Sequence, residues 1–67
     1  MKKFAERLKE LRIEKNLSQA QLAIATGLSH TAIVYWESEK RVPNANAIII
    51  LADFFNVTTD YLLGVEA

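Results

Sequence analysis

Two helix-start signals, placed close together, constrain the fold of this 67-residue chain more than any other feature. Ser18 is followed three residues later by Gln21, the spacing of a capping box, in which each side chain bonds the backbone amide of the other residue. Gly27 ends that helix because glycine accepts a positive φ at no steric cost, and Ser29 then caps another helix. The sequence therefore predicts two short helices, at about 19–26 and 30–38, joined by a three-residue turn, which is typical of a helix-turn-helix.

Three further helices are predicted around this pair. Apolar residues at the helical period indicate an amphipathic first helix near residues 3–15 and a fourth helix at about 45–55, and a last short helical turn follows. Residues that cap or stop helices stand at the expected ends: Asn16, Asn44, Asn56, Thr58 and Gly64. No segment alternates with period two over a useful length. We therefore expect one all-α domain, residues 1–67, made of five short helices.

Composition narrows the classes of function. The chain is 51% hydrophobic and 24% charged and has no cysteine, which is a globular composition without a disulfide or a thiolate metal site. The longest apolar run, Ala47–Ala52, is too short to cross a membrane. One histidine, no cysteine and no glycine-rich phosphate loop leave too little chemistry for an enzyme. We expect a cytoplasmic, non-enzymatic domain with no cofactor and no bound metal.

Charge is unevenly distributed along the chain, although the formal net charge is zero. All eight basic residues fall within positions 1–41, where they meet five acids, and positions 42–67 hold three acids and no base. A basic half and an acidic half indicate that one face of the domain meets phosphate, whereas the zero net charge taken alone argues mildly against a polyanion partner.

The third helix has one polar and one apolar face when residues 30–38 are placed at about 100° per residue. Its apolar face carries Ile33 and Trp36 and is expected to be buried, together with Ala32 and Glu37. The opposite face carries hydrogen-bonding groups, one methyl-bearing side chain and no acid: His30, Thr31, Val34, Tyr35 and Ser38. Such a face suits the major groove of DNA, where bases present donors, acceptors and the thymine methyl group, although any amphipathic helix has a polar outer face.

Glu37 lies on the face that is expected to be buried, and a buried carboxylate must find a partner or lose its charge. Arg12, one residue past the apolar stripe of the first helix, is the best-placed basic residue, since a guanidinium binds a carboxylate through two parallel hydrogen bonds. We expect the two to form an ion pair that supports the fold and does no chemistry.

Seven short motifs follow one another over residues 4–64. They are Arg7-Leu8-Lys9-Glu10-Leu11-Arg12, Leu17-Ser18-Gln19-x-x-Leu22-Ala23, Gly27-Leu28-Ser29, Ile33-x-x-Trp36-Glu37, Lys40-Arg41-x-Pro43, Leu51-Ala52 and Asp60-Tyr61-Leu62-Leu63-Gly64. In order and spacing the set resembles the phage-repressor/Cro class of helix-turn-helix regulators, also called the XRE family. The resemblance implies a lambda-repressor-like fold of five helices that binds double-stranded DNA as a transcriptional regulator, most often a repressor, with the third helix in the major groove and the second across the backbone.

The resemblance also implies roles for the matching residues. Base-reading positions are occupied by His30, Thr31 and Tyr35, with Val34 as a contact to a thymine methyl group. Contacts to the DNA backbone fall to Ser18 and Gln19 at the start of the second helix and to Ser38, Lys40 and Arg41 after the third. Arg12 and Glu37 match the internal ion pair of the family.

Glu39 departs from the family pattern, which usually has glycine at this position. The sequence therefore does not determine the conformation of the turn after the third helix, or whether that turn contacts the DNA backbone. An acid beside phosphate is also unfavourable, so Lys40 and Arg41 must outweigh it.

The family implies a homodimer on a pseudo-palindromic operator, with two recognition helices about one DNA turn apart. Ile49, Ile50 and Phe54 lie off the core stripe of the fourth helix, and two interpretations of them are equally open. They either form the contact between subunits or fill the small core of this domain.

Other functions in the same fold stay open at this point. One is an interaction module that does not bind DNA. Another keeps DNA binding but serves as an antitoxin or a restriction-modification controller instead of a prophage or metabolic repressor. The chain is either a whole regulator or the N-terminal part of a longer one.

Overall fold

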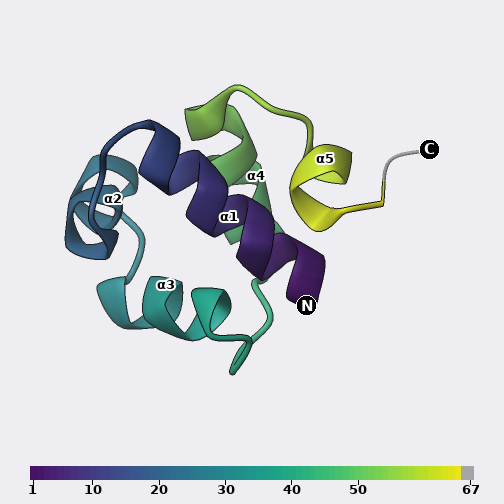
Figure 1. Cartoon of the computed structure of the whole chain (residues 1–67), viewed down its shortest axis with the longest axis horizontal. Helices are drawn as coiled ribbons and strands as arrows, with labels where there is room; N and C mark the ends of the chain where they lie inside the picture. The colour runs from purple at the N-terminus through teal and green to yellow at the C-terminus, as the bar shows by residue number, and fades with distance from the viewer. Residues whose placement is uncertain (66–67) are drawn as a thin grey trace.

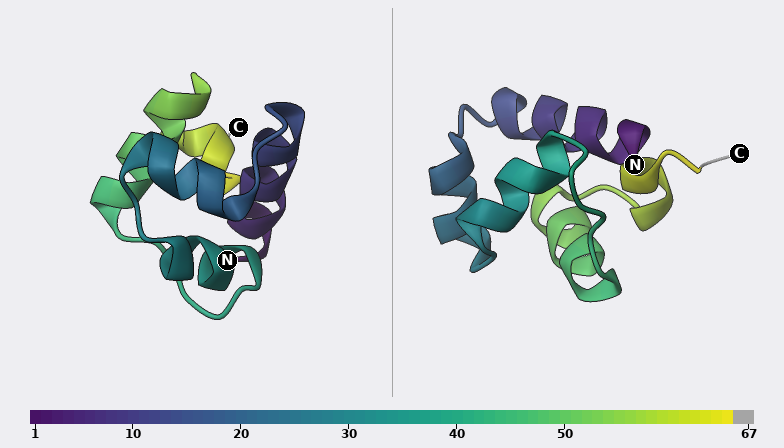
Figure 2. Two further views of the ribbon diagram at one scale, coloured as in Figure 1. Left: turned by 90° about the vertical axis from the view of Figure 1, so that its left-hand side faces the viewer. Right: turned by 90° about the horizontal axis from the view of Figure 1, so that it is seen from below.

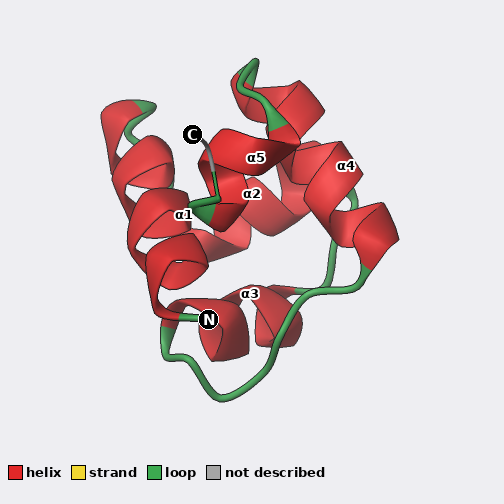
Figure 3. Cartoon of the chain, turned by 90° about the vertical axis from the view of Figure 1, so that its right-hand side faces the viewer, coloured by secondary structure: helices red, strands yellow, loops and turns green. Residues whose placement is uncertain are grey.

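The computed structural model describes residues 1–65, and that part of the chain consists of five α-helices without a strand (Figures 1 and 3). The helices are α1 (Lys2–Glu14), α2 (Gln19–Thr26), α3 (His30–Glu37), α4 (Ala45–Phe55) and α5 (Thr59–Leu63). The predicted all-α class and the order of the helices are confirmed, with α1 shifted by one residue and α3 ending one residue earlier than predicted. Residues 66 and 67 of the predicted domain lie outside the described residues.

The helices begin and end where side chains or glycine satisfy their terminal backbone groups. The Ser18 hydroxyl accepts a hydrogen bond from the Gln21 amide at 3.0 Å, and the Gln21 side chain accepts one from the Ser18 amide at 2.8 Å, which completes the capping box. Gly27 ends α2 with φ of 77°. The remaining helix starts are capped by the side chains of Ser29, Asn44 and Thr58, and Asn16, Asn56 and Gly64 adopt positive φ after α1, α4 and α5.

The five helices pack around one small core (Figure 1). Helix α1 lies between α3 and α5, α2 packs against α3 and α4, and α4 packs against α5. Every helix contributes at least one fully buried side chain, and these are Phe4, Leu8, Leu22, Ile33, Leu51 and Leu62. The ring of Trp36 on α3 meets Phe4 on α1 edge-on, with 6.3 Å between the ring centroids. The interior face predicted for α3 from Ile33 and Trp36 is therefore the face that joins it to the core.

Helix α5 closes the fold over the start of α1. A Cβ atom on Gly64, whose φ is 75°, would lie 2.5 Å from Cβ of Lys3, so both the backbone conformation and the available space require glycine here. The guanidinium of Arg7 lies 4.2 Å from the centroid of the Tyr61 ring and donates a hydrogen bond to the Tyr61 carbonyl. The two ends of the described chain therefore lie side by side, away from α2.

Candidate DNA interface

Helix α3 lies at the surface next to α2, as the view from below in Figure 2 shows. His30 and Thr31, at its N-terminal end, are exposed, and Val34 and Tyr35 are half-buried. Within residues 1–65, the side chains of His30 and Thr31 make no hydrogen bond, ion pair or ring contact. The fold therefore leaves these two side chains available to a ligand.

The segment after α3 turns back over the end of that helix. The Tyr35 carbonyl accepts hydrogen bonds from the Lys40 amide at 2.9 Å, the Arg41 amide at 3.3 Å and the Ser38 hydroxyl at 3.3 Å. Glu39 supplies the reversal with a φ of 66°, so the turn forms with glutamate where the family pattern has glycine. The guanidinium of Arg41 lies 4.7 Å from the centroid of the Tyr35 ring. The turn thereby holds the Arg41 guanidinium beside the C-terminal half of the outer face of α3 and fixes the backbone of Lys40 next to it.

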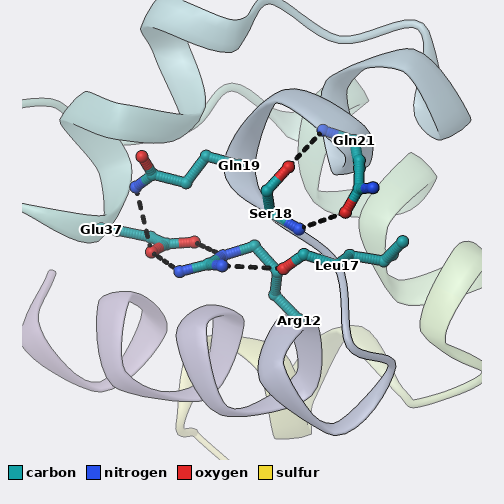
Figure 4. Close-up of polar contacts among 6 residues, drawn as sticks. All are labelled: Arg12, Leu17, Ser18, Gln19, Gln21 and Glu37. Carbon is teal, nitrogen blue, oxygen red and sulfur yellow. Dashed lines mark hydrogen bonds and ion pairs between the residues drawn. The ribbon is translucent and has the colours of Figure 1, made fainter.

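Arg12 and Glu37 lie in contact and join three helices (Figure 4). The Arg12 Nε donates to one carboxylate oxygen of Glu37 at 2.7 Å and Nη2 donates to the other at 2.8 Å. Nη1 of the same guanidinium donates to the Leu17 carbonyl at 2.9 Å, and the Gln19 amide nitrogen donates to Glu37 at 3.2 Å. The two charged side chains are 12% and 5% exposed, and no buried side-chain nitrogen or oxygen in the described chain lacks a partner.

The hydrogen bond with Glu37 raises the pKa of Arg12, partial burial lowers it, and the charge of Glu37 raises it further, so that the net shift is upward. A group whose pKa is raised by folding contributes its full stabilisation below its ordinary pKa and loses it only as the pH rises through the higher value. For an arginine this window lies far above neutral pH. Arg12 therefore stays protonated throughout the pH range around neutrality.

A groove of about 350 Å³ lies beside this ion pair, lined by Lys9, Arg12, Gln19, Val34, Glu37 and Ser38. It brings together Gln19 from α2 and Ser38 from the end of α3, which were both predicted to contact the DNA backbone. The groove also contains Lys9, a residue that the sequence analysis did not single out. Its position three residues before Arg12 places both on one face of α1, and this spacing is the signal that identifies it.

Gln19 can bond Glu37 and still offer a hydrogen-bond donor to a ligand. Its side-chain amide donates one hydrogen bond to Glu37, and a second N–H remains because a primary amide carries two donors. The first backbone amides of α2 have no acceptor inside the helix. The start of α2 is therefore fixed against the ion pair while it still presents donors to the surface.

The three residues predicted for a subunit contact are not equivalent in the structure. Ile49 is 59% exposed, whereas Ile50 and Phe54 are half-buried. The Phe54 ring packs against the core and meets Phe55 edge-on at 5.0 Å, with the Lys15 ammonium 5.6 Å from its centroid. Phe54 thus serves the core of this domain on one side, and Ile49 is the most exposed of the three side chains.

Residues 1–65 contain neither a metal-site cluster nor a helix that could cross a membrane. No group of three or more histidine, aspartate or glutamate side chains there has the arrangement of a metal site. None of their helices combines the length and the apolar character that a membrane crossing requires.

A helix-turn-helix with an exposed polar face on its second helix and cations beside that face defines a DNA-binding class of domain. The family model described as Helix-turn-helix matches residues 8–62 of this chain. The chain therefore belongs to this helix-turn-helix family, the phage-repressor/Cro or XRE type, whose members are DNA-binding transcriptional regulators.

Individual relatives agree with this membership. The chain is 48% identical over 63 residues to the HTH-type transcriptional activator BcrR of Enterococcus faecalis, a match that covers 94% of the chain and 31% of BcrR. It is 41% identical over 61 residues to the HTH-type transcriptional regulator AnsR of Bacillus subtilis, which covers 91% of the chain and 53% of AnsR. The chain thus spans 31% of the length of one of these relatives and 53% of the other.

A solved structure is similar over nearly its whole length. The restriction-modification controller protein C.AhdI from Aeromonas hydrophila superposes with a TM-score of 0.81 at 34% identity, covering 91% of this chain and 92% of that one. The lambda-repressor-like arrangement of five helices predicted from the sequence is therefore shared with this controller protein over 92% of its solved chain.

Proposed function

We propose that this chain binds double-stranded DNA in a sequence-specific manner and regulates transcription, with α3 in the major groove and α2 across the backbone. One observation carries the proposal: the outer face of α3 has exposed side chains that the fold does not use, and Lys40 and Arg41 are held beside it. A protein interaction module has no need of a polar helix face with two basic residues in the turn that follows it.

The residues on the outer face of α3 divide into hydrogen-bonding and apolar readers. His30, Thr31 and Tyr35 offer donors and acceptors to base edges in the major groove, where every base pair presents a distinct pattern. Val34 offers methyl groups to the thymine methyl. Val34 and Tyr35 are half-buried, so their side chains have less rotamer freedom to lose when they contact a base.

Phosphate contacts come from both ends of the helix-turn-helix. Ser18 and Gln19 act at the start of α2, where unpaired amides and the helix dipole favour an anion. Ser38, Lys40 and Arg41 act in the segment after α3. Lys9 joins them, because it lines the same groove as Gln19 and Ser38.

A homodimer on a pseudo-palindromic operator completes the proposal. Two α3 helices placed about one DNA turn apart read two half-sites of the same sequence. The exposed Ile49, with Ile50 and the outer edge of Phe54, supplies an apolar strip on α4 for the second copy.

Repression is the simpler outcome, because occupation of a promoter by this domain excludes other proteins from the DNA without any further contact. Activation is the second candidate, favoured by the 48% identity with BcrR, which is named an activator. A reporter gene placed behind the selected site separates the two, since expression falls in one case and rises in the other. In either case the protein acts in the cytoplasm, where the DNA of a prokaryotic cell is found.

The first experiment is the selection of bound duplexes from a random DNA library at two salt concentrations. Enrichment of a two-fold-symmetric site, with binding that weakens steeply as salt rises, is the expected result. Failure to enrich any sequence at either concentration contradicts sequence-specific binding. Enrichment of a site without symmetry contradicts the dimer alone.

The dependence of binding on salt tests the phosphate contacts after α3. Replacement of both Lys40 and Arg41 by alanine is expected to reduce the slope of log K against log salt by about two, since each phosphate contact in duplex DNA contributes about 0.9. Lys15→Ala is the matched control, because that ammonium lies over Phe54 on α4, and its slope should not change. An unchanged slope in the double variant would exclude both residues as phosphate contacts.

A further inference from the structure

The turn after α3 has a standard hydrogen-bond pattern but an unusual residue at its key position. The Lys40 amide donates to the Tyr35 carbonyl at 2.9 Å, and the Glu39 amide donates to the Trp36 carbonyl at 3.3 Å. These two bonds define the helix-ending motif in which the residue after the cap adopts a left-handed conformation. That residue is Glu39, with a φ of 66°.

Glutamate is the exception among the positive-φ positions of the described chain. Two of them are glycine and two are asparagine, the residue types that tolerate this region: Gly27, Gly64, Asn16 and Asn56. Glu39 is the fifth, and its Cβ makes this conformation less favourable than it is for glycine. The turn requires the left-handed conformation but not a glutamate, so the choice of this residue type is a pointer to function.

No side-chain contact of Glu39 within the described residues adds to the two backbone hydrogen bonds of this turn. The Glu39 side chain is exposed and makes no hydrogen bond or ion pair in residues 1–65, although Lys40 and Arg41 follow it directly. The Arg41 guanidinium lies over the Tyr35 ring instead. The carboxylate is therefore exposed and forms no ion pair within residues 1–65, and neither the turn nor the core requires its charge.

The position of this charge suggests what it acts on. Glu39 lies between Ser38 and the two cations that we assign to phosphate, so it reduces the net charge of this four-residue segment from +2 to +1. For a phosphate held by the neighbouring cations at an assumed distance of about 7 Å in water, this charge would oppose binding by a factor of about three, and the effect falls as salt screens it. Because phosphate is present in every sequence, the effect is the same for any duplex.

We propose that Glu39 limits the affinity of this domain for DNA: its carboxylate repels the phosphate backbone beside Lys40 and Arg41 and weakens operator and random DNA alike. The inference rests on the proposed function and adds a residue that opposes binding. Glu39 then has two independent effects: its charge lowers the affinity for DNA, and its left-handed backbone conformation lowers the stability of the fold.

Three substitutions separate charge from backbone strain. Glu39→Gln removes the charge and keeps a side chain that tolerates positive φ poorly. Glu39→Asp keeps the charge and introduces a residue type that enters this region more readily, and Glu39→Asn does both. None of the three removes a contact that the structure shows, so all are expected to fold.

The measurements are DNA affinity at low and high salt, for the selected operator and for a random duplex of equal length, and the melting temperature without DNA. Glu39→Gln is expected to bind both duplexes about three-fold more tightly at low salt, with a gain that disappears at about 1 M salt, and to melt as the parent does. Glu39→Asp is expected to melt a few degrees higher and to keep the parental affinity. Glu39→Asn is expected to show both changes.

Other outcomes overturn the proposal in distinguishable ways. If the parent binds DNA and Glu39→Gln binds no better at low salt, Glu39 does not limit affinity, and the proposed function is untouched. If Glu39→Asp alters affinity as much as Glu39→Gln does, the shape of the turn controls binding and the charge does not. If parent and Glu39→Gln both fail to bind any duplex at low salt, the proposed function itself is wrong.

Discussion

The two ends of α3 differ in how firmly the fold holds them. At the N-terminal end, His30 and Thr31 are exposed, and the side-chain contribution to the fold is the Ser29 hydroxyl, which accepts the Ala32 amide at 3.2 Å. At the C-terminal end, Glu37 is bound to α1 and α2, and the Tyr35 carbonyl and ring hold the following turn.

This difference separates two tasks along α3: the N-terminal end is free to contact DNA bases, and the C-terminal end holds the helix in the fold. The N-terminal residues of a recognition helix approach base edges most closely. A family that reads many sequences needs those positions free of structural duties, so that they vary without loss of stability. The C-terminal end must instead keep its residues, because their contacts hold α3 against α1 and α2. Substitutions should therefore separate into losses of binding and losses of stability by their position on α3.

The largest effect is expected from the ion pair at the C-terminal end. Arg12→Ala leaves the nearly buried Glu37 carboxylate with Gln19 as its remaining side-chain donor, and the free energy of unfolding should fall by about 3 kcal/mol. Urea denaturation at neutral pH measures this loss. The double variant Arg12→Met with Glu37→Leu is the control, since an apolar pair replaces the charges and should be far less harmful. A single variant as stable as the double one would contradict a structural role for the pair.

Tyr35 lies at the boundary between the two ends of α3, so its removal should reduce both DNA affinity and stability. Tyr35→Ala is expected to weaken operator binding by about 1–3 kcal/mol, with little change for random DNA. It should also lower stability by about 0.5–1 kcal/mol, because the ring beneath Arg41 is removed. Tyr35→Phe keeps the ring and removes the hydroxyl, so it should retain stability and lose affinity for the operator only. Equal losses on both duplexes would refute base reading by Tyr35.

His30 tests the free end of the helix. His30→Ala is expected to weaken operator binding by about 1–2 kcal/mol and to leave unfolding within about 0.5 kcal/mol of the parent, because the side chain has no hydrogen bond or ring contact in residues 1–65. Binding titrations on operator and random duplexes, together with thermal melts, measure both. A clear loss of stability would show that the fold uses this end of α3 after all.

Local features of the fold were predictable from the sequence because their causes lie within four residues. The capping box of Ser18 and Gln21 and the left-handed stops at Asn16 and Gly27 are examples. Arg12 and Glu37 are 25 residues apart, and their contact was still predictable, because a carboxylate on an apolar face requires a cation and α1 carries one at the edge of its stripe.

Features that depend on the placement of one segment against another were not predictable. A helical wheel places Tyr35 on the outer face, and it is half-buried because the turn after α3 folds back and sets Arg41 over its ring. The spacing of Lys9 to Arg12 places both on one face of α1, but the groove that Lys9 shares with Gln19, and the hydrogen bond from Gln19 to Glu37, depend on the packing of α1 and α2 against the end of α3. The sequence therefore located the candidate interface, and tertiary packing decided which of its side chains are held.

The smallest effect concerns the cap of α3, the one side-chain hydrogen bond through which its N-terminal end serves the fold. Ser29→Ala removes the acceptor for the Ala32 amide and should lower the free energy of unfolding by about 1 kcal/mol. Ser29→Thr keeps a hydroxyl and should recover most of that loss in a urea titration. If alanine and threonine are equally destabilising, the hydroxyl is not the cause. If neither has an effect, the first turn of α3 is held by Ile33 and the core alone, and the difference between the two ends is larger still.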